Sequence, residues 1–221
     1  MKTKALLVLS TFMAVAFIAT PIKAAGTIDQ QQTATDGTEL LASTAQSICQ
    51  TFTSGTTGYL EQVALWMSTS YNEQAPATVS ILGTVAGSPN SSVVLWSGSF
   101  SNLAQGWFYV DTAVSAPLLT AGQVYGLELQ SSALVTGTTN LDKWYATGYY
   151  PATDAYSGGG LYTNTGSGWN PVLSKSSTAT VDAAFITYMQ QVPEPGTLGI
   201  VLSGLGMLVL FQRRRRRHIF A

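Results

Sequence analysis

The last thirty residues, 192–221, constrain this chain more than any other stretch. An uncharged apolar run from Thr197 to Phe211 is followed by a block of arginines. As a helix the run would be about 24 Å long, slightly less than the hydrocarbon core of a bilayer at about 30 Å, and arginine side chains can extend to the interface to close the gap. We therefore expect one C-terminal transmembrane helix. The alternatives are a buried core helix, which would not end in an arginine block, and a basic nucleic-acid-binding tail.

The arginine block also predicts the orientation of this helix. Clustered positive charge stays on the cytoplasmic side of a membrane, so the preceding domain is expected outside. The orientation cluster consists of Arg213, Arg214, Arg215, Arg216 and Arg217. An exported domain meets no nucleic acid, and we expect no nucleic-acid partner.

The N-terminus is typical of a secretory signal peptide over residues 1–24. Lys2 and Lys4 provide the positive start, an apolar run follows from Ala5 to Ile18, and a small-residue cleavage site ends at Ala24. An N-terminal membrane helix is the alternative, but the run is short and a proline follows it. The mature protein is therefore expected to be exported.

The segment between the two ends is acidic. Residues 26–191 contain two lysines and ten Asp or Glu residues, a net charge of −8, which repels nucleic acid phosphates and anionic lipid headgroups. The only cysteine is Cys49, so no internal disulfide can form, and we expect this thiol to pack as a small buried hydrophobe.

A short motif precedes the apolar run, formed by Pro193, Glu194 and Pro195. Proline fixes its own φ and disfavours the α region in the residue before it, so the motif predicts an extended, protease-accessible segment at the membrane surface. The motif, the short hydrophobic helix and the arginine cluster together resemble the PEP-CTERM sorting signal. The resemblance implies a substrate of an exosortase, a transpeptidase-like membrane enzyme of Gram-negative bacteria that make exopolysaccharide. The helix would then be a temporary inner-membrane anchor, removed when the protein passes to the cell surface or extracellular matrix.

The middle segment predicts an all-β fold, an antiparallel β-sandwich of jelly-roll-like type. Short runs rich in β-branched and aromatic residues alternate with turn residues, and helical periodicity is absent. The expected strands are Leu60 to Met67, Thr78 to Leu82, Ser92 to Trp96, Gly106 to Val110, Gln123 to Gln130, Lys143 to Ala146 and Val181 to Met189. Side-chain alternation places Val63, Leu65, Val79, Ile81, Leu127, Leu129, Ala183 and Phe185 in the core.

The order of elements in this segment also resembles the exported β-sandwich ectodomains called choice-of-anchor domains, particularly type R. The matching stretches are Ala45-Gln46, Gln50 to Thr53, Leu119 to Leu127, Gly158 to Trp169 and Val181 to Tyr188. The resemblance implies a fold and an exported location, and it implies no reaction.

The residues needed for most catalytic systems are absent from the exported segment. The only histidine is His218, on the cytoplasmic side of the expected anchor, which excludes Ser-His-Asp and Cys-His nucleophile systems and His or Cys metal clusters. A glycosidase-like carboxylate pair could still come from Asp111, Glu128, Asp142 or Asp154, but nothing in their spacing selects a pair. We expect no enzyme activity and no cofactor or metal, with calcium bound by Asp142, Asp154 and loop carbonyls as an alternative.

Aromatic residues are concentrated between residues 141 and 171. Such rings can stack on sugars while neighbouring amides and carboxylates bind the hydroxyls. The candidate glycan contacts are Trp144, Tyr145, Tyr149, Tyr150 and Trp169. The alternative is that Trp144, Tyr145 and Trp169 are buried at the end of the core.

The sequence thus predicts four segments: a signal peptide at 1–24, a flexible lead at 25–40, a β-sandwich ectodomain at 41–191 and the sorting signal at 192–221. The expected function is that of a structural or adhesive component of the extracellular matrix, processed by an exosortase. A glycan-binding module on the same sorting route, with extracellular polysaccharide as its partner, is the alternative.

Overall fold

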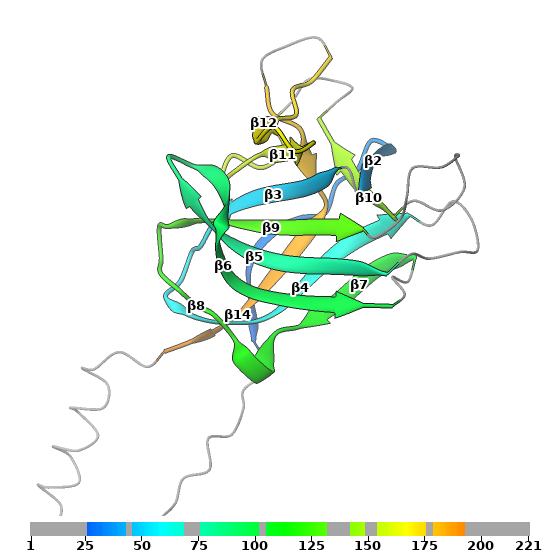
Figure 1. Ribbon diagram of the computed structural model, residues 1–221. Coiled ribbons are helices and arrows are strands. Elements are labelled where there is room, and N and C mark those ends of the chain that lie inside the picture. The colour runs from blue at the N-terminus through cyan, green and yellow to red at the C-terminus, as the bar shows by residue number, and fades with distance from the viewer. Residues whose placement is uncertain are drawn as a thin grey trace, which may run out of the picture.

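The computed structural model describes residues 26–42, 46–68, 76–101, 105–131, 142–148, 154–175 and 179–192. These residues form two antiparallel sheets packed face to face and one short 3₁₀ helix, η1 (Ala113–Ser115) (Figure 1). The predicted all-β class and the two-sheet antiparallel architecture are confirmed. The jelly-roll-like strand order stays a prediction. In these ranges no helix has the length and apolarity to cross a membrane, and the expected anchor and signal peptide lie outside them.

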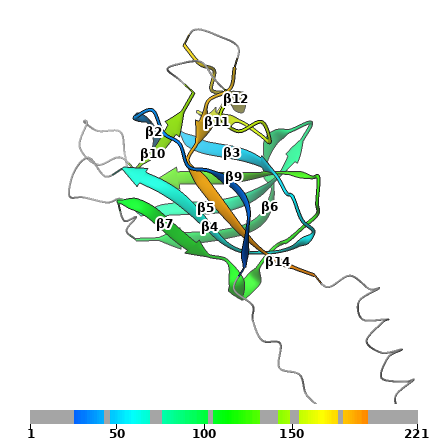
Figure 2. The same ribbon diagram turned by 180° about the vertical axis from the view of Figure 1, so that it is seen from behind.

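One sheet has eight strands and is organised around the long strand β4. It contains β1 (Thr27–Gln32), β2 (Thr38–Ala42), β4 (Gly58–Ser68), β7 (Gly106–Asp111), β8 (Leu118–Leu119), β10 (Asp142–Thr147), β13 (Asp182–Ala183) and β14 (Phe185–Gln191). Strands β14, β10, β7 and β8 all pair with β4, and β1 adds to the far edge of β14. This sheet faces the viewer in Figure 2.

The other sheet has six strands in the order β12-β11-β3-β9-β5-β6. Their bounds are β3 (Ser47–Thr53), β5 (Ala77–Val85), β6 (Ser88–Phe100), β9 (Val124–Ser131), β11 (Leu161–Asn164) and β12 (Trp169–Pro171). Strands β5 and β6 are joined by a two-residue turn at Ala86 and Gly87, both with positive φ (49° and 82°), the geometry that matches the right-handed twist of a hairpin. Figure 1 views this sheet from outside.

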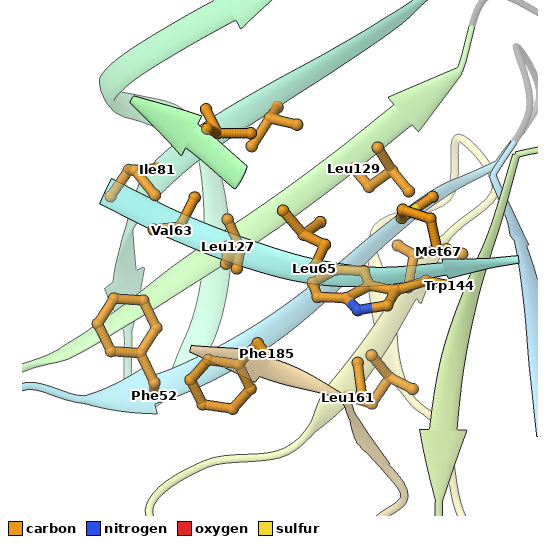
Figure 3. Packing of buried hydrophobic residues seen from close by; sticks show 14 of the residues in the cluster. Phe52, Val63, Leu65, Met67, Ile81, Leu127, Leu129, Trp144, Leu161 and Phe185 are labelled. Carbon is orange, nitrogen blue, oxygen red and sulfur yellow. The ribbon is translucent and has the colours of Figure 1, made fainter. Parts of the chain in front are cut away.

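The core lies between the two sheets and is built by side-chain alternation. All eight residues predicted to point inward are fully buried. The largest buried side chain, Trp144 of β10, lies beside Leu65 and Met67 in Figure 3, and its indole N–H donates a hydrogen bond to the Ala184 carbonyl oxygen at 2.8 Å. Phe185 packs against Phe52 with ring centroids 6.0 Å apart, so β14 and β3 meet across the sandwich.

All seven predicted strand segments correspond to strands of the structure, although Gln123 and Val181 each lie one residue before their strand and Ala184 separates β13 from β14. The flexible lead predicted for residues 25–40 is wrong in part, because Thr27–Gln32 forms strand β1, paired with β14 along five positions, and Thr38 begins β2. The lead is polar because β1 is an edge strand that contributes little to the core: only Gln32 is buried.

Candidate functional site

The sorting motif and the orientation cluster, Pro193 to Pro195 and Arg213 to Arg217, lie outside the described residues. The structure does show where the chain leaves the sandwich. Strand β14 ends at Gln191 opposite Gly58, and the Val192 amide donates to the Thr57 carbonyl oxygen at 3.4 Å. Figures 1 and 2 agree that the end of β14, the start of β1 and η1 lie at the same end of the molecule.

The three predicted glycan contacts that lie in the described residues, Trp144, Tyr145 and Trp169, do not form one surface site. Trp144 is fully buried, so it is a core residue and its glycan assignment is wrong. Tyr145 follows it on β10 of the eight-stranded sheet, while Trp169 lies on β12 of the six-stranded sheet and donates its indole N–H to the Ser91 hydroxyl at 2.9 Å. Tyr149 and Tyr150 lie outside the described residues.

Another aromatic residue of the same segment, Tyr156, closes one side of the core. Its ring meets Phe185 edge to face with centroids 5.2 Å apart, and its hydroxyl donates to Gln30 Oε1 at 2.8 Å. Burial is the main cause that raises the pKa of Tyr156 to about 12. This residue therefore acts in packing, and it fixes β1 to the segment that follows residue 153.

A buried carboxylate joins the two sheets. Asp182 of β13 accepts hydrogen bonds from the side-chain amide of Gln50 at 3.2 Å and from the backbone amides of Ala155 and Tyr156 at 3.2 and 3.0 Å. Gln50, on β3 of the other sheet, in turn accepts from the Ala183 amide at 2.7 Å. Burial raises the pKa of Asp182 to about 6, although these hydrogen bonds oppose the change. The donors satisfy both carboxylate oxygens, which supports a structural role.

The outward side of the eight-stranded sheet carries a row of aromatic rings, which we name the aromatic face. Strands β4, β7 and β14 alternate, with one set of side chains in the core and the other set outside. The outward set includes two ring pairs: Trp66 with Trp107, edge to face at 5.1 Å, and Tyr109 with Tyr188, tilted at 6.5 Å. Burial and the neighbouring Tyr109 raise the pKa of Tyr188. The remaining members are Ile28, Tyr59, Leu118 and Ile186.

The outward side of the six-stranded sheet is different, and we name it the hydroxyl face. Its members are Ser47, Cys49, Thr78, Ser80, Ser97, Ser99, Glu128, Gln130, Tyr162, Asn164 and Trp169. Hydroxyl pairs cross from β5 to β6, with Ser80 and Ser97 3.1 Å apart and Thr78 and Ser99 3.3 Å apart. In Figure 1 the strands β3, β9 and β5 present this face to the viewer.

Glu128 and Cys49 lie opposite each other at the centre of the hydroxyl face. Burial raises the pKa of Glu128, and a hydrogen bond from the Ser47 hydroxyl partly offsets this. Burial, with a smaller effect from Glu128, raises the pKa of the Cys49 thiol well above its ordinary value. The thiol is fully buried, as predicted, and it is therefore a packing group with little thiolate.

Two of the carboxylates considered for catalysis, Asp111 and Glu128, lie on different sheets. Asp111 is on β7 of the eight-stranded sheet and Glu128 is on the hydroxyl face of the other, so these two cannot flank one substrate bond. Within the described part of the chain no three His, Cys, Asp or Glu residues are grouped to hold a metal ion.

The aromatic face is the feature that sequence reasoning missed. The local density of aromatic residues along the chain is highest in residues 141–171 and therefore indicates that segment instead. The signal that identifies the face is a continuous run of apolar residues within a strand: in Gly106 to Asp111, Trp107 and Tyr109 point outward between the inward Phe108 and Val110. Apolar residues at both parities of a strand indicate that both of its sides carry apolar surface.

Comparison with known proteins bears on the tail and on the fold. Residues 191–217 match the family described as the PEP-CTERM protein-sorting motif. The tail carries this sorting motif. The motif begins at the last residue of β14, so the signal follows the sandwich without an intervening linker. No curated protein matches the chain.

Two similar solved structures are both of Cwp84. One is the clostridial cysteine protease Cwp84 after propeptide cleavage, with a TM-score of 0.52, 15% identity, and coverage of 74% of this chain and 40% of that chain. The other contains the cysteine protease and lectin-like domains of Cwp84, a surface layer associated protein of Clostridium difficile, with a TM-score of 0.52, 14% identity, and coverage of 74% and 36%. This chain spans well under half of either, and at these identities the likeness shows the fold alone.

Proposed function

We propose that this chain is an exported, non-catalytic β-sandwich protein that an exosortase processes at its C-terminal tail and delivers to the surface or extracellular matrix of a Gram-negative bacterium. The observation that carries this proposal is the match of residues 191–217 to the PEP-CTERM protein-sorting motif. A predicted signal peptide at 1–24 and a predicted membrane helix over Thr197 to Phe211 support it, because such a tail is useful only to a chain that reaches the membrane.

The role at the surface is proposed to be structural or adhesive. In its described residues the domain has one buried thiol and a carboxylate whose oxygens are occupied by backbone and amide donors, and two of the catalytic candidates, Asp111 and Glu128, lie on different sheets. These features support a stable module that presents surfaces, and the sorting route supports a matrix location.

The test uses two tail variants that should fail differently. Glu194→Ala leaves the apolar run and the arginines intact, so the precursor should insert correctly and stay uncut. Replacement of Arg213 to Arg217 by neutral residues removes the barrier to full translocation, so the uncut precursor should be misoriented or released. Membrane fractionation and the C-terminal mass are measured in the native host with and without its exosortase. A full C-terminus in both hosts would show a permanent anchor and reject the sorting proposal.

A second candidate function is glycan binding on the hydroxyl face. The observation that favours it is the edge of this face, where the half-buried rings of Tyr162 and Trp169 lie beside Asn164, with Glu128 and Gln130 further along. Aromatic rings next to amide and hydroxyl groups suit sugars. Glycan-array binding of the whole chain should be lost in Trp169→Ala and kept in Tyr145→Ala, since Tyr145 lies on the other sheet; equal binding by both variants excludes this face.

A further inference from the structure

Exposed apolar side chains gather at the end of the sandwich from which the tail leaves. Of the eleven large apolar residues exposed in the described ranges, six belong to one surface, which we name the end patch: Ile28 (53% exposed), Tyr59 (44%), Tyr109 (50%), Val114 (103%), Leu118 (54%) and Val192 (41%). Isolated exposed apolar residues are ordinary, but a contiguous group marks a surface that something else covers.

Strand pairing makes these residues neighbours. Leu118, Tyr59 and Gln190 form one row across β8, β4 and β14, and Val192 follows Gln190 by two residues. Val114 is on η1, which connects β7 to β8 and lies at this end in Figures 1 and 2. On the neighbouring row, Ile28 of β1 lies opposite Tyr188 of β14. The end patch thus overlaps the aromatic face, with which it shares Ile28, Tyr59, Tyr109 and Leu118, and it ends where the tail begins.

The length of the tail limits how far this end can be from a membrane. Only residues 193–196 separate Val192 from the apolar run that starts at Thr197. An extended chain covers at most about 3.5 Å per residue, so Val192, the end-patch residue next to the tail, lies within roughly 20 Å of the point where the run enters the bilayer. This step rests on the proposed function, in which the run is a membrane anchor before processing.

The chemistry of the patch fits a lipid surface. The patch combines aliphatic side chains with two tyrosines, and tyrosine is enriched at membrane interfaces because its ring is apolar and its hydroxyl is polar. None of the six is basic, and the preceding strand β7 ends at exposed Asp111. The contact is therefore apolar, and we expect it on zwitterionic lipid and see no basis for attraction to anionic lipid.

We propose that, while the tail is uncut, the end patch rests on the outer surface of the bilayer, with Val114, Leu118 and Tyr59 among the lipid headgroups. This contact would hold the sandwich upright on its tether and keep residues 193–195 at a fixed height for the processing enzyme. After cleavage the same residues would be exposed to water.

The single buried cysteine provides a clean test. Cys49 is fully buried, so a cysteine introduced at Val114 or Leu118 is the one that a soluble thiol dye labels. The matched control is Val85→Cys, because Val85 is 64% exposed but lies at the β5–β6 turn of the other sheet. The full chain is placed in phosphatidylcholine nanodiscs, one chain per disc, and quenching of the dye by aqueous iodide is measured. Quenching at positions 114 and 118 should be at least about threefold weaker than at 85, since interfacial residues bury about 5–10 Å into the headgroup region.

The outcomes separate this proposal from the one on which it rests. A chain that does not stay in the discs lacks a membrane anchor, and both proposals fall. A chain that stays in the discs but shows equal quenching at 114 and 85 keeps its anchor and overturns only the end-patch proposal. Protection at 114 that needs two chains per disc, or that occurs without lipid, assigns the patch to a second copy and also overturns it. A second pair of variants tests the same contact without moving the dye. In the Leu118→Cys background, Val114→Asp should weaken the contact with lipid and raise iodide quenching of the dye at position 118, whereas Val85→Asp should leave this quenching unchanged.

Discussion

The two outer faces of this sandwich have different chemistry although they share one core. The aromatic face pairs Trp66 with Trp107 and Tyr109 with Tyr188, whereas the hydroxyl face carries cross-strand pairs such as Ser80 with Ser97 around Glu128. An antiparallel sheet commonly has one solvated, polar side, and the hydroxyl face follows this rule. The aromatic face does not. The inward residues of both sheets form the core that stabilises the fold. The outward residues differ between the sheets, so the two faces can contact different kinds of partner.

The largest expected change in stability comes from a substitution in the hydrophobic core, which lies between the two sheets. Leu127 of β9 is fully buried between the sheets, so Leu127→Asp places an unpaired charge in the core and should cost more than about 4 kcal/mol of unfolding free energy. Gln130→Asp, on the exposed outer side of the same strand, is the control and should change stability by less than about 0.5 kcal/mol. Urea unfolding measures both. Equal stability of the two variants would mean that the register of β9 is wrong.

The next effect tests how tightly the hydroxyl face is packed. A Cβ atom at Gly126 would lie 2.7 Å from Cys49 Sγ and 3.5 Å from Leu82 Cβ, so Gly126→Ala should destabilise the protein by about 1–3 kcal/mol through overpacking. Adding Cys49→Ala removes the sulfur atom and should recover part of that loss. Thermal unfolding of the single and double variants gives the coupling, and strict additivity would show that the two side chains do not compete for one space.

A smaller effect concerns the polar bridge between the sheets. The pKa of Asp182 is raised from 3.8 to about 6, so the folded state holds a proton that the unfolded state has already released. The contribution of Asp182 to stability is therefore greatest below about pH 4 and is lost as the pH rises towards about 6, a change of about 1–2 kcal/mol after solvent screening. Wild type should be more stable at about pH 5 than at about pH 7.5 in urea titrations.

Asp182→Asn should flatten this pH dependence, and Asp36→Asn, at an exposed position, should retain it. Glu128, whose pKa is also raised, adds a change of the same sign that remains in both variants. A pH profile of Asp182→Asn identical to that of wild type would show that Asp182 is not the group responsible.

The smallest expected effect on stability is on the aromatic face itself. Replacing Tyr109 and Tyr188 together by Ser removes the contact between an exposed and a half-buried ring, which contributes about 0.5–1.5 kcal/mol, yet it should sharply reduce binding of a hydrophobic dye to the folded protein. Ser97→Ala with Ser99→Ala on the hydroxyl face should leave dye binding unchanged. If both double variants bind the dye as wild type does, the two faces do not differ in accessible apolar surface.

Strands with a clear local pattern of apolar residues could be predicted from the sequence. Strands whose buried polar residues are satisfied by hydrogen bonds to residues far away in the sequence could not. In β9, the stretch from Leu127 to Gln130 shows the period of two on its own. In β3, by contrast, Gln50 and Thr51 are buried with their hydrogen-bonding groups satisfied by Asp182, Ala183 and Gly160, more than 100 residues away. No local pattern reveals such partners, and β3 was not predicted.

The candidate sites also differ in whether their residues are contiguous in the sequence. The sorting motif is contiguous in sequence, so Pro193 to Pro195 and the residues around them could be identified directly, and the match at 191–217 agrees. A surface site is assembled from separate strands: the aromatic face needs the pairing of β4 with β7 and β14 before its rings become neighbours. Density along the chain instead selected Trp144, which the fold places in the core.

Strand β14 has a mechanical consequence as the last strand before the tail. It is hydrogen-bonded on both sides, to β1 over five paired positions and to β4 over seven. A pull on the tail along the strand axis, resisted elsewhere in the domain, loads both rows of bonds in shear, so that many must yield together, whereas peeling an edge strand breaks them one after another. The tail is therefore attached to a strand in the interior of a sheet, and force applied to the tail is distributed over the three strands β1, β14 and β4.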